Sequence, residues 1–251
     1  MASTPSLSAS ELVEVVDAAS SADPAEQGRA LLALALPDPS DERLDMTALE
    51  VRDAWLLELR CATFGQTLKA RIACPRCQTR LALEIPRESI PLPEPRADCL
   101  SAPPMRVSHG ELVIDARSPD GDALERAARC PDTASARASL IASCVTVRSA
   151  SGEALDVESL DEETLERVGE ALAAAQPGVE VALDLSCASC GHLWNPVLDV
   201  LLFFWRELST TSVQVLDEVH ELASAYGWSE EQILGLSSRR RRQYVERLVR
   251  A

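Results

Sequence analysis

Two short cysteine pairs are the residues of this chain whose type and spacing could do chemistry. Cys74-Pro-Arg-Cys77 and Cys187-Ala-Ser-Cys190 each place two thiols on one tight turn. Two such turns brought together supply four thiolates, the ligand set of a closed tetrahedral zinc site with no open coordination position. We therefore predict a structural Zn²⁺ ion held by Cys74, Cys77, Cys187 and Cys190.

Strand-like segments lie on both sides of each cysteine pair. Residues 66–73 and 79–85 alternate in polarity around the first pair, and residues 179–186 and 191–194 surround the second. Because a period of two is typical of strands, each pair is predicted to lie at the turn of a β-hairpin. Two other interpretations are weaker. A redox CxxC pair is expected to open a helix, and disulfides are disfavoured because the N-terminal residues lack a signal-peptide pattern.

The interval between the two pairs is unusually long. Residues 78–186, which are 109 in number, separate them, far more than a compact zinc ribbon needs. The ribbon is therefore predicted to be split by an insertion, with the metal ion joining two distant segments. Its binding free energy would then contribute to the folding of the whole chain.

The fold class predicted from these elements is α+β and mostly helical, with a zinc-ribbon-like pair of knuckles split by a helical insertion. Helix starts, stops and proline-rich stretches divide the chain into six segments. These are an N-terminal helical module (1–65), a first zinc knuckle hairpin (66–86), a Pro-rich linker (87–105), a mixed, mostly helical insertion (106–178), a second zinc knuckle hairpin (179–196) and a C-terminal helical module with a basic tail (197–251).

Local signals predict where several helices begin and end. Thr47 is predicted to cap a helix, because Glu50 follows at the capping-box spacing. After the second hairpin, an apolar segment over 197–208 and a separate helix over 213–226 are predicted, the latter ending at Gly227.

The insertion is predicted to contain a short β segment at its start, followed by helices. Residues 106–116 predict one short strand or hairpin. Helical patterns then cover 120–128, 133–145 and 161–175.

Composition and charge narrow the classes of partner. With 251 residues, 46% of them hydrophobic, the chain can bury one sizeable core or two small ones. The most apolar stretch, 197–205, is far shorter than the roughly 20 residues that span a bilayer, so no membrane partner is expected. The formal net charge is −16, but residues 239–251 hold six arginines and one acid, or +5, which leaves −21 on residues 1–238. Such an acidic body repels phosphate backbones and disfavours general nucleic-acid binding.

No catalytic constellation is visible in the sequence. The chain has no HExxH, GxSxG or glycine-rich phosphate loop, and its histidines, His109, His192 and His220, are scattered. His192 follows Cys190 by two residues, so it could replace a cysteine as ligand or donate to a thiolate, although a polar strand residue is the simpler interpretation. We therefore predict no enzymatic activity and no small-molecule substrate. A hydrolase of unrecognised type stays as a minor alternative.

Aromatic and arginine side chains near the C-terminus suggest a partner-binding surface. Guanidinium groups can hold phosphates or carboxylates, and amphipathic rings are common at interfaces. The alternative is that the arginines are a solvated helix start and that the rings anchor helices to the core. The candidate partner-binding residues are Trp205, Arg206, Tyr226, Trp228, Arg239, Arg240, Arg241, Arg242 and Tyr244.

The order of these features resembles a known family, the baseplate hub assembly chaperones of T-even-type contractile-tailed phages and related contractile injection systems. The resemblance covers roughly the whole chain and is least distinct over 106–178. The matching features are Glu50-Val-Arg-Asp53 before Leu56 to Leu59, ACPRC after Phe64-Gly65, SCASCGHLW, Phe204-Trp205-Arg206-Glu207, and Ala223-Ser-Ala-Tyr-Gly-Trp228-Ser-Glu-Glu followed by Ile233-Leu234 and Arg239 to Tyr244.

The resemblance implies a non-enzymatic chaperone or adaptor that binds baseplate or hub proteins of a contractile tail. It also implies that the protein acts in the cytoplasm of a bacterial producer or a phage-infected cell. The competing hypothesis from the residues is a zinc-ribbon nucleic-acid-binding or transcription accessory protein whose arginine tail contacts phosphate.

Overall fold

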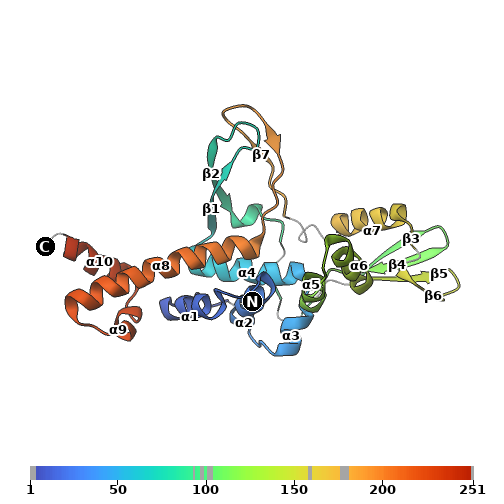
Figure 1. Cartoon of the computed structure of the whole chain (residues 1–251). Helices are drawn as coiled ribbons and strands as arrows, with labels where there is room; N and C mark the ends of the chain where they lie inside the picture. Colours follow the sequence, from blue (N-terminus) through green and yellow to red (C-terminus); the bar gives the residue numbers. More distant parts are fainter. Residues whose placement is uncertain are drawn as a thin grey trace.

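The chain folds into an elongated molecule with four parts. In the computed structural model a central helical body carries a tower of two hairpins, a lobe lies at one end, and short helices lie at the other end beside the C-terminus (Figure 1). The lobe interrupts the chain between the two hairpins. The structure describes residues 4–92, 94–96, 99–100, 104–157, 160–175 and 181–249.

The fold is mixed α/β, and about 53% of the described residues are helical. The helices are α1 (Ala9–Ala19), α2 (Pro24–Ala35), α3 (Asp41–Met46), α4 (Leu49–Phe64), the 3₁₀ helix η1 (Arg87–Ser89), α5 (Gly121–Ala128), α6 (Thr133–Cys144), α7 (Glu162–Ala175), α8 (Val200–Tyr226), α9 (Glu230–Leu234) and α10 (Ser238–Val249). The strands are β1 (Thr67–Ala73), β2 (Arg80–Pro86), β3 (Met105–His109), β4 (Leu112–Ala116), β5 (Val145–Ser149), β6 (Ala154–Leu155), β7 (Leu185–Ser186) and β8 (Leu193–Trp194).

Most N-terminal helix starts follow local capping, with one exception. Ser8 caps α1 through a capping box with Glu11. The predicted capping of α4 by Thr47 is wrong. The N-cap of α4 is Ala48, which makes no side-chain cap, because the Thr47 hydroxyl instead donates to the Arg43 carbonyl of α3 at 2.6 Å. The short helix α3, which the sequence analysis did not predict, provides this acceptor.

The main hydrophobic core joins segments that precede and follow the insertion. Buried leucines of α2 and α4 pack with the first half of α8, where Phe204 and Leu208 are fully buried. The base of the tower adds Leu68 of β1 and Val181. Burial of these apolar side chains stabilises the return of the chain to the body after the lobe.

The lobe has its own small core. An antiparallel four-stranded sheet of order β3-β4-β5-β6 packs with α7, and Ile114, Val147 and Val168 are buried between them. The prediction of a single strand or hairpin in this region was incomplete, because β5 and β6 were not foreseen. Strand β5 begins at Val145, directly after α6 ends at Cys144. No glycine or proline separates the helix from the strand, so the local sequence carries no stop signal.

Helix α8 is continuous where two separate segments were predicted. It runs for 27 residues from Val200 to Tyr226. The intervening Ser209 and Thr210 lie within it. Their hydroxyls donate to the carbonyls of Trp205 and Arg206 four residues earlier, both at 2.8 Å, and so do not cap the start of a new helix. The helix therefore begins in the body and carries the chain outward to the C-terminal end of the molecule (Figure 1).

Turn residues set the end of α8 and the start of α9. Gly227 ends α8 with a φ of 67°, a left-handed conformation that glycine adopts without strain. Ser229 and Gln232 then form a capping box at the start of α9.

Although α8 is long, no helix in the described ranges combines the length and apolar character that a membrane crossing requires.

A nearly buried ion pair fixes α8 against α4. The Arg60 side chain is 3% exposed and donates two hydrogen bonds of 2.8 Å to the carboxylate of Glu207. The third contact of its guanidinium, at 2.6 Å, is the carbonyl of Gly65 at the end of α4. The bidentate geometry orients α8 relative to α4.

Replacing Arg60 by methionine is expected to lower the free energy of unfolding by about 3 kcal/mol, because the variant removes a buried cation that pairs with Glu207 and donates to the Gly65 carbonyl. The control is Arg106→Met, because the Arg106 side chain is 69% exposed and its ion pair with Asp115 contributes about 1 kcal/mol or less. Denaturant unfolding of both variants measures the difference. Equal losses of unfolding free energy in the two variants would show that the buried Arg60 pair stabilises the fold no more than an exposed pair does.

Candidate metal centre

The four predicted cysteines converge at the tip of the tower. Their sulfur atoms all lie within 4.8 Å of one another. Cys74 Sγ is 3.7 Å from Cys190 Sγ, and Cys77 Sγ is 3.6 Å from Cys187 Sγ. The predicted convergence of the two pairs is therefore confirmed.

The sulfur spacing fits a tetrahedral metal ion better than a disulfide. Metal–sulfur bonds of about 2.3 Å at tetrahedral angles place sulfur atoms about 3.8 Å apart, whereas a disulfide requires about 2.05 Å. All four cysteines are free thiols. The arrangement can thus hold one ion through four ligands, and the donor set is one that zinc and iron share.

The two knuckles have the same backbone plan. In the first, Cys74 N donates to the Thr79 carbonyl and Gln78 N donates to the Cys74 carbonyl. In the second, Cys187 N donates to the carbonyl of His192, and Gly191 N donates to that of Cys187.

The fourth residue after the first cysteine has a positive φ in both knuckles. The φ angle is 59° at Gln78 and 69° at Gly191. Glycine reaches this region freely, whereas glutamine does so at a cost. The glycine was a recognisable signal in the sequence, and the glutamine was not.

The thiols differ in their tendency to ionise. Hydrogen bonding with the side chain and the backbone of Thr79 lowers the pKa of the exposed Cys77 thiol to about 6. A backbone hydrogen bond from His192 favours the Cys190 thiolate, but burial and the neighbouring thiols raise the pKa of Cys190 to about 12. A bound cation would favour the thiolate form of all four and release protons on binding.

His192 lies near the cluster without joining it. Its ring stacks on Trp194, with ring centroids 5.9 Å apart and an interplanar angle of 8°. The group of residues that could share an ion contains the four cysteines and not this histidine. His192 therefore lies outside the ligand group, directly before β8 and not within the strand.

The second hairpin is less regular than the sequence predicted. Of the predicted strand 179–186, residues 179 and 180 lie outside the described residues, and β7 covers only Leu185–Ser186. An isolated bridge pairs Ala182 with Val197 nearer the body. Within the described part of the tower, β1-β2 and β7-β8 form separate two-stranded sheets. The thiol cluster is therefore the contact that joins the two hairpin tips.

Two of the predicted partner-binding residues are buried, which corrects their assignment. The Trp205 ring belongs to the main core and is 9% exposed. Arg241 is 4% exposed, because its guanidinium bonds to Glu218 of α8 at 2.8 Å and to the Leu236 carbonyl at 2.7 Å. Both side chains hold helices together, and neither presents a surface to a partner.

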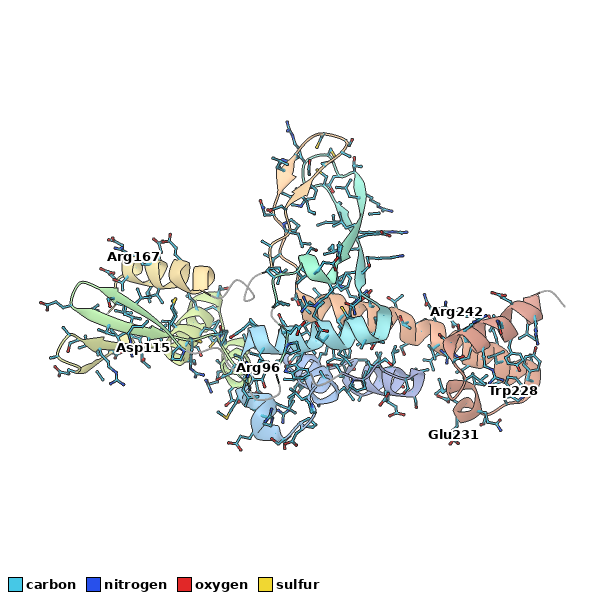
Figure 2. The ribbon with its side chains drawn as sticks, turned by 180° about the vertical axis from the view of Figure 1, so that it is seen from behind. Arg96, Asp115, Arg167, Trp228, Glu231 and Arg242 are labelled. Carbon is cyan, nitrogen blue, oxygen red and sulfur yellow. The ribbon has the colours of Figure 1, made fainter. Side chains whose placement is uncertain are left out.

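The other aromatic residues predicted to bind a partner lie together at the C-terminal end. Tyr226 stacks on Trp228 with centroids 4.8 Å apart, and Tyr244 of α10 meets Trp228 edge-on at 5.0 Å. We call these three rings the aromatic cluster. Figure 2 shows Trp228 and Arg242 at this end of the molecule, opposite the lobe that carries Asp115 and Arg167. Arg206, Arg239, Arg240 and Arg242 are exposed.

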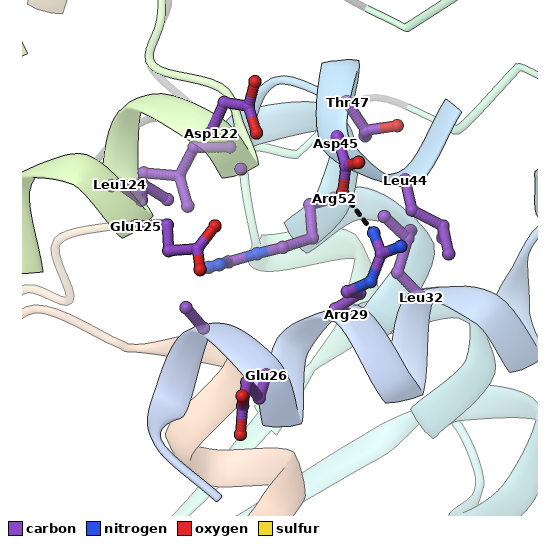
Figure 3. A pocket seen from close by; sticks show the side chains of 13 residues that line it. Glu26, Arg29, Leu32, Leu44, Asp45, Thr47, Arg52, Asp122, Leu124 and Glu125 are labelled. Atoms are coloured by element: carbon purple, nitrogen blue, oxygen red, sulfur yellow. Dashed lines mark hydrogen bonds and ion pairs between the residues drawn. The ribbon is translucent and has the colours of Figure 1, made fainter. Parts of the chain in front are cut away.

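A separate cavity of about 320 Å³ lies where the lobe meets the body. Helices α2, α4 and α5 contribute to its walls, and Arg52 points across it toward Glu125 (Figure 3). Arg29 pairs with Asp45 and, at 2.7 Å, with Asp41. The lining mixes both signs of charge and contains no nucleophile–base pair, so it provides no catalytic constellation.

The fold and the thiol cluster define a mixed α/β protein in which cysteines distant in the sequence converge on one candidate metal site. The family described as T4 bacteriophage base plate protein matches residues 8–205. This stretch is most of the chain and contains both cysteine pairs, so the chain belongs to this family. The predicted resemblance is thereby confirmed at the level of a phage baseplate protein. No curated protein and no solved structure matches the chain with significance.

We expect the purified protein to contain one tightly bound metal ion per chain, and Cys77→Ser to lose it, because three thiolates bind far more weakly than four. The matched control is Cys130→Ser, since Cys130 lies in the lobe at the end of α5. Elemental analysis after gel filtration gives the stoichiometry. An unchanged metal content in Cys77→Ser would contradict the assignment of the ligands.

Trp205→Ala is expected to lower the free energy of unfolding by about 3–5 kcal/mol, the usual loss for a buried ring. Its exposed neighbour provides the control, because Arg206→Ala removes a surface side chain and changes stability by about 0.5 kcal/mol or less. Thermal melting compares the two. A wild-type melting curve for Trp205→Ala would place the ring outside the core.

Proposed function

We propose that this protein is a non-enzymatic, zinc-stabilised assembly chaperone or adaptor for the baseplate or hub of a contractile phage tail or injection system. The observation that carries the proposal is the family match over residues 8–205, which includes both cysteine pairs. The partners are other baseplate or hub proteins. The site of action is the cytoplasm of a bacterial producer or a phage-infected cell.

Zinc is the proposed occupant of the thiol cluster. Four thiolates without an open position are the ligand set of structural zinc sites, and zinc has no preference that would distort a tetrahedron. In a zinc-ribbon-like arrangement the ion would clasp the hairpins on either side of the insertion. We also propose that the six segments predicted from the sequence are the working units of the chain.

The absence of catalysis is part of this proposal. A closed tetrahedral site supplies no metal-bound water, so the metal centre offers no hydrolytic mechanism. His220 is exposed on α8, and His192 is stacked on Trp194, so neither has the base–orienter geometry of a catalytic histidine.

The C-terminal end is proposed as one partner-binding surface. It lies beyond the family match, which ends at residue 205. The aromatic cluster is partly exposed there, and Arg247 lies over the Tyr244 ring at 5.6 Å. Exposed rings beside guanidinium groups are the composition of interface hot spots. The exposed arginines of α10 favour an acidic partner surface.

The same arginines favour the second candidate function, nucleic-acid binding. Arg239, Arg240 and Arg242 are exposed on one helix, and guanidinium groups bind phosphate well. The −21 on residues 1–238 opposes this candidate. Duplex DNA retained by the full-length protein at physiological salt, and lost in the arginine variant described below, would favour it over the assembly role.

The experiment that tests the assembly role is removal of the protein from producing cells. Electron microscopy of lysates is expected to show tails or sheaths without baseplates, and supply of the intact chain from a plasmid is expected to restore assembly. A plasmid encoding Cys77→Ser is expected to restore it poorly. Normal baseplates in cells that lack the protein would overturn the proposal.

Reversing the charge of Arg239, Arg240 and Arg242 to glutamate is expected to weaken the complex with the baseplate partner about tenfold or more, through loss of charge complementarity. The matched control reverses three exposed arginines of the lobe, Arg126, Arg129 and Arg137. Titration calorimetry with the purified partner measures both. Equal affinities for the two triple variants would remove the arginines of α10 from the interface.

A further inference from the structure

A groove of about 570 Å³ lies in the corner between the tower and α8. One wall is β1, and the other is the face of α8 that turns toward it (Figure 1). The residues that line the groove are Arg60, Phe64, Thr67, Lys69, Ala70, Arg71, Phe203, Arg206, Glu207, Thr210, Thr211 and Gln214. The groove is open to solvent and is separate from the thiol cluster at the tip of the tower.

The base of the groove is rigid and aromatic. The Arg60 guanidinium lies 5.9 Å from the Phe64 ring centroid and 5.8 Å from that of Phe203. Its bidentate bond to Glu207 holds it there. The wall and the base are thus preorganised, which lowers the entropy lost when a ligand binds.

The outer edge of β1 is an unused strand edge. In an antiparallel pair, residues with hydrogen bonds to the partner strand alternate with residues whose main chain faces away. The ladder between β1 and β2 is framed by the bonds Arg87 N to Gln66 O and Cys74 N to Thr79 O. With the observed register, Leu68, Ala70 and Ile72 bond to β2.

The main chain of Thr67, Lys69 and Arg71 therefore points away from β2. Strand β1 pairs only with β2 within the described residues. The sheet position opposite Thr67 is Pro86, which has no N–H to offer the ladder and fits a pair without hydrogen bonds. The outward N–H and C=O groups of β1 are free to pair with another strand.

The groove is positively charged on an acidic protein. It is lined by four basic side chains and one acidic side chain, Glu207, whose charge is matched by Arg60. Lys69 has only a loose, exposed contact with Glu84 at 3.8 Å. Arg71 and Arg206 are exposed and form no ion pair within the described part of the chain. Side chains with nitrogen at their tips project from this side of the tower above α8 (Figure 2).

We propose that this groove binds an extended acidic segment of a partner protein, which adds to β1 as a third strand. Main-chain hydrogen bonds to Thr67, Lys69 and Arg71 would supply affinity, and carboxylates facing Arg71 and Arg206 would supply specificity. The inference deepens the proposed function, because it rests on the protein having a protein partner and gives that partner a site.

The charges on β1 disfavour a second copy of this chain as the occupant. Lysine and arginine on an edge strand keep identical edges apart. Pairing β1 with another β1 would bring Lys69 and Arg71 against side chains of the same sign, which destabilises a cross-strand pair. An acidic strand would place side chains of opposite sign against Lys69 and Arg71, which stabilises a cross-strand pair.

The first experiment uses a fluorescein-labelled octapeptide of alternating valine and glutamate with the full-length, metal-loaded protein. Fluorescence anisotropy is expected to show saturable binding that weakens with added NaCl. A peptide with lysine in place of glutamate, and one with alternate backbone nitrogens methylated, are expected not to bind. Binding of the lysine peptide with equal affinity, or of none of the three, overturns the inference.

Charge and main chain are tested by separate variants. Arg71→Glu and Arg206→Glu are each expected to weaken peptide binding about tenfold, whereas Arg148→Glu, on the exposed side of β5 in the lobe, leaves it unchanged. Lys69→Pro removes the charge and also the outward N–H, which does not bond to β2. Lys69→Ala removes only the charge. Weaker binding by the proline variant than by the alanine variant is expected, and equal binding would contradict strand addition.

Hydrogen exchange gives a readout that does not depend on a folded proline variant. The peptide is expected to slow exchange of the Thr67, Lys69 and Arg71 amides and to leave those of Leu68 and Ala70, which already bond to β2, nearly unchanged. Slowing elsewhere only, or binding of an oligonucleotide at Arg71 and Arg206 instead of the acidic peptide, overturns the inference. Baseplate assembly in cells is measured separately. If the peptide does not bind but baseplates still fail to assemble in cells that lack the protein, the binding site is rejected and the proposed function stands.

Discussion

The convergence of four cysteine sulfurs at the tip of the tower is a contact between segments on either side of the lobe. Cys74 and Cys77 leave the body on one hairpin, and Cys187 and Cys190 return on another after the whole lobe has been built. Because the two hairpins share no strand pairing in the described residues, the thiol cluster joins their tips. An ion bound there would close a loop of 109 residues, and its binding free energy would belong to the fold.

A second long-range contact works at the base of the tower. Arg60 at the end of α4 and Glu207 on α8 lie 147 positions apart in the chain, yet they form a bidentate pair. The tip and the base of the tower thus use different chemistry, four converging thiols above and a charge-assisted ion pair below. The ion pair orients α8 relative to α4, and α8 forms one wall of the groove beside β1.

The family match covers the chain unevenly. Residues 8–205 contain the body, the tower and the lobe, whereas most of α8 and all of α9 and α10 lie beyond the match. Helix α8 carries this last part outward, where the aromatic cluster and the exposed Arg239, Arg240 and Arg242 lie.

Local chemistry accounts for what the sequence predicted well. Two CxxC turns, the capping residues of α1 and α9, the glycine that ends α8 and the arginine run are signals contained within a few residues, so the hairpins, the thiol cluster and most helices could be predicted. The strand β5, the continuity of α8 and the real cap of α4 were missed, because there the local pattern is ambiguous and neighbouring elements decide.

The sequence by itself therefore determined the ligand set and its two turns, the charge imbalance between the body and the tail, and the class of protein. Only the tertiary structure decided which arginines face solvent. Arg241 is buried against Glu218 while its neighbours are exposed, and Trp205 packs in the core next to an exposed Arg206. Burial depends on which face of a helix meets another element, and that contact is made by residues far away in the chain.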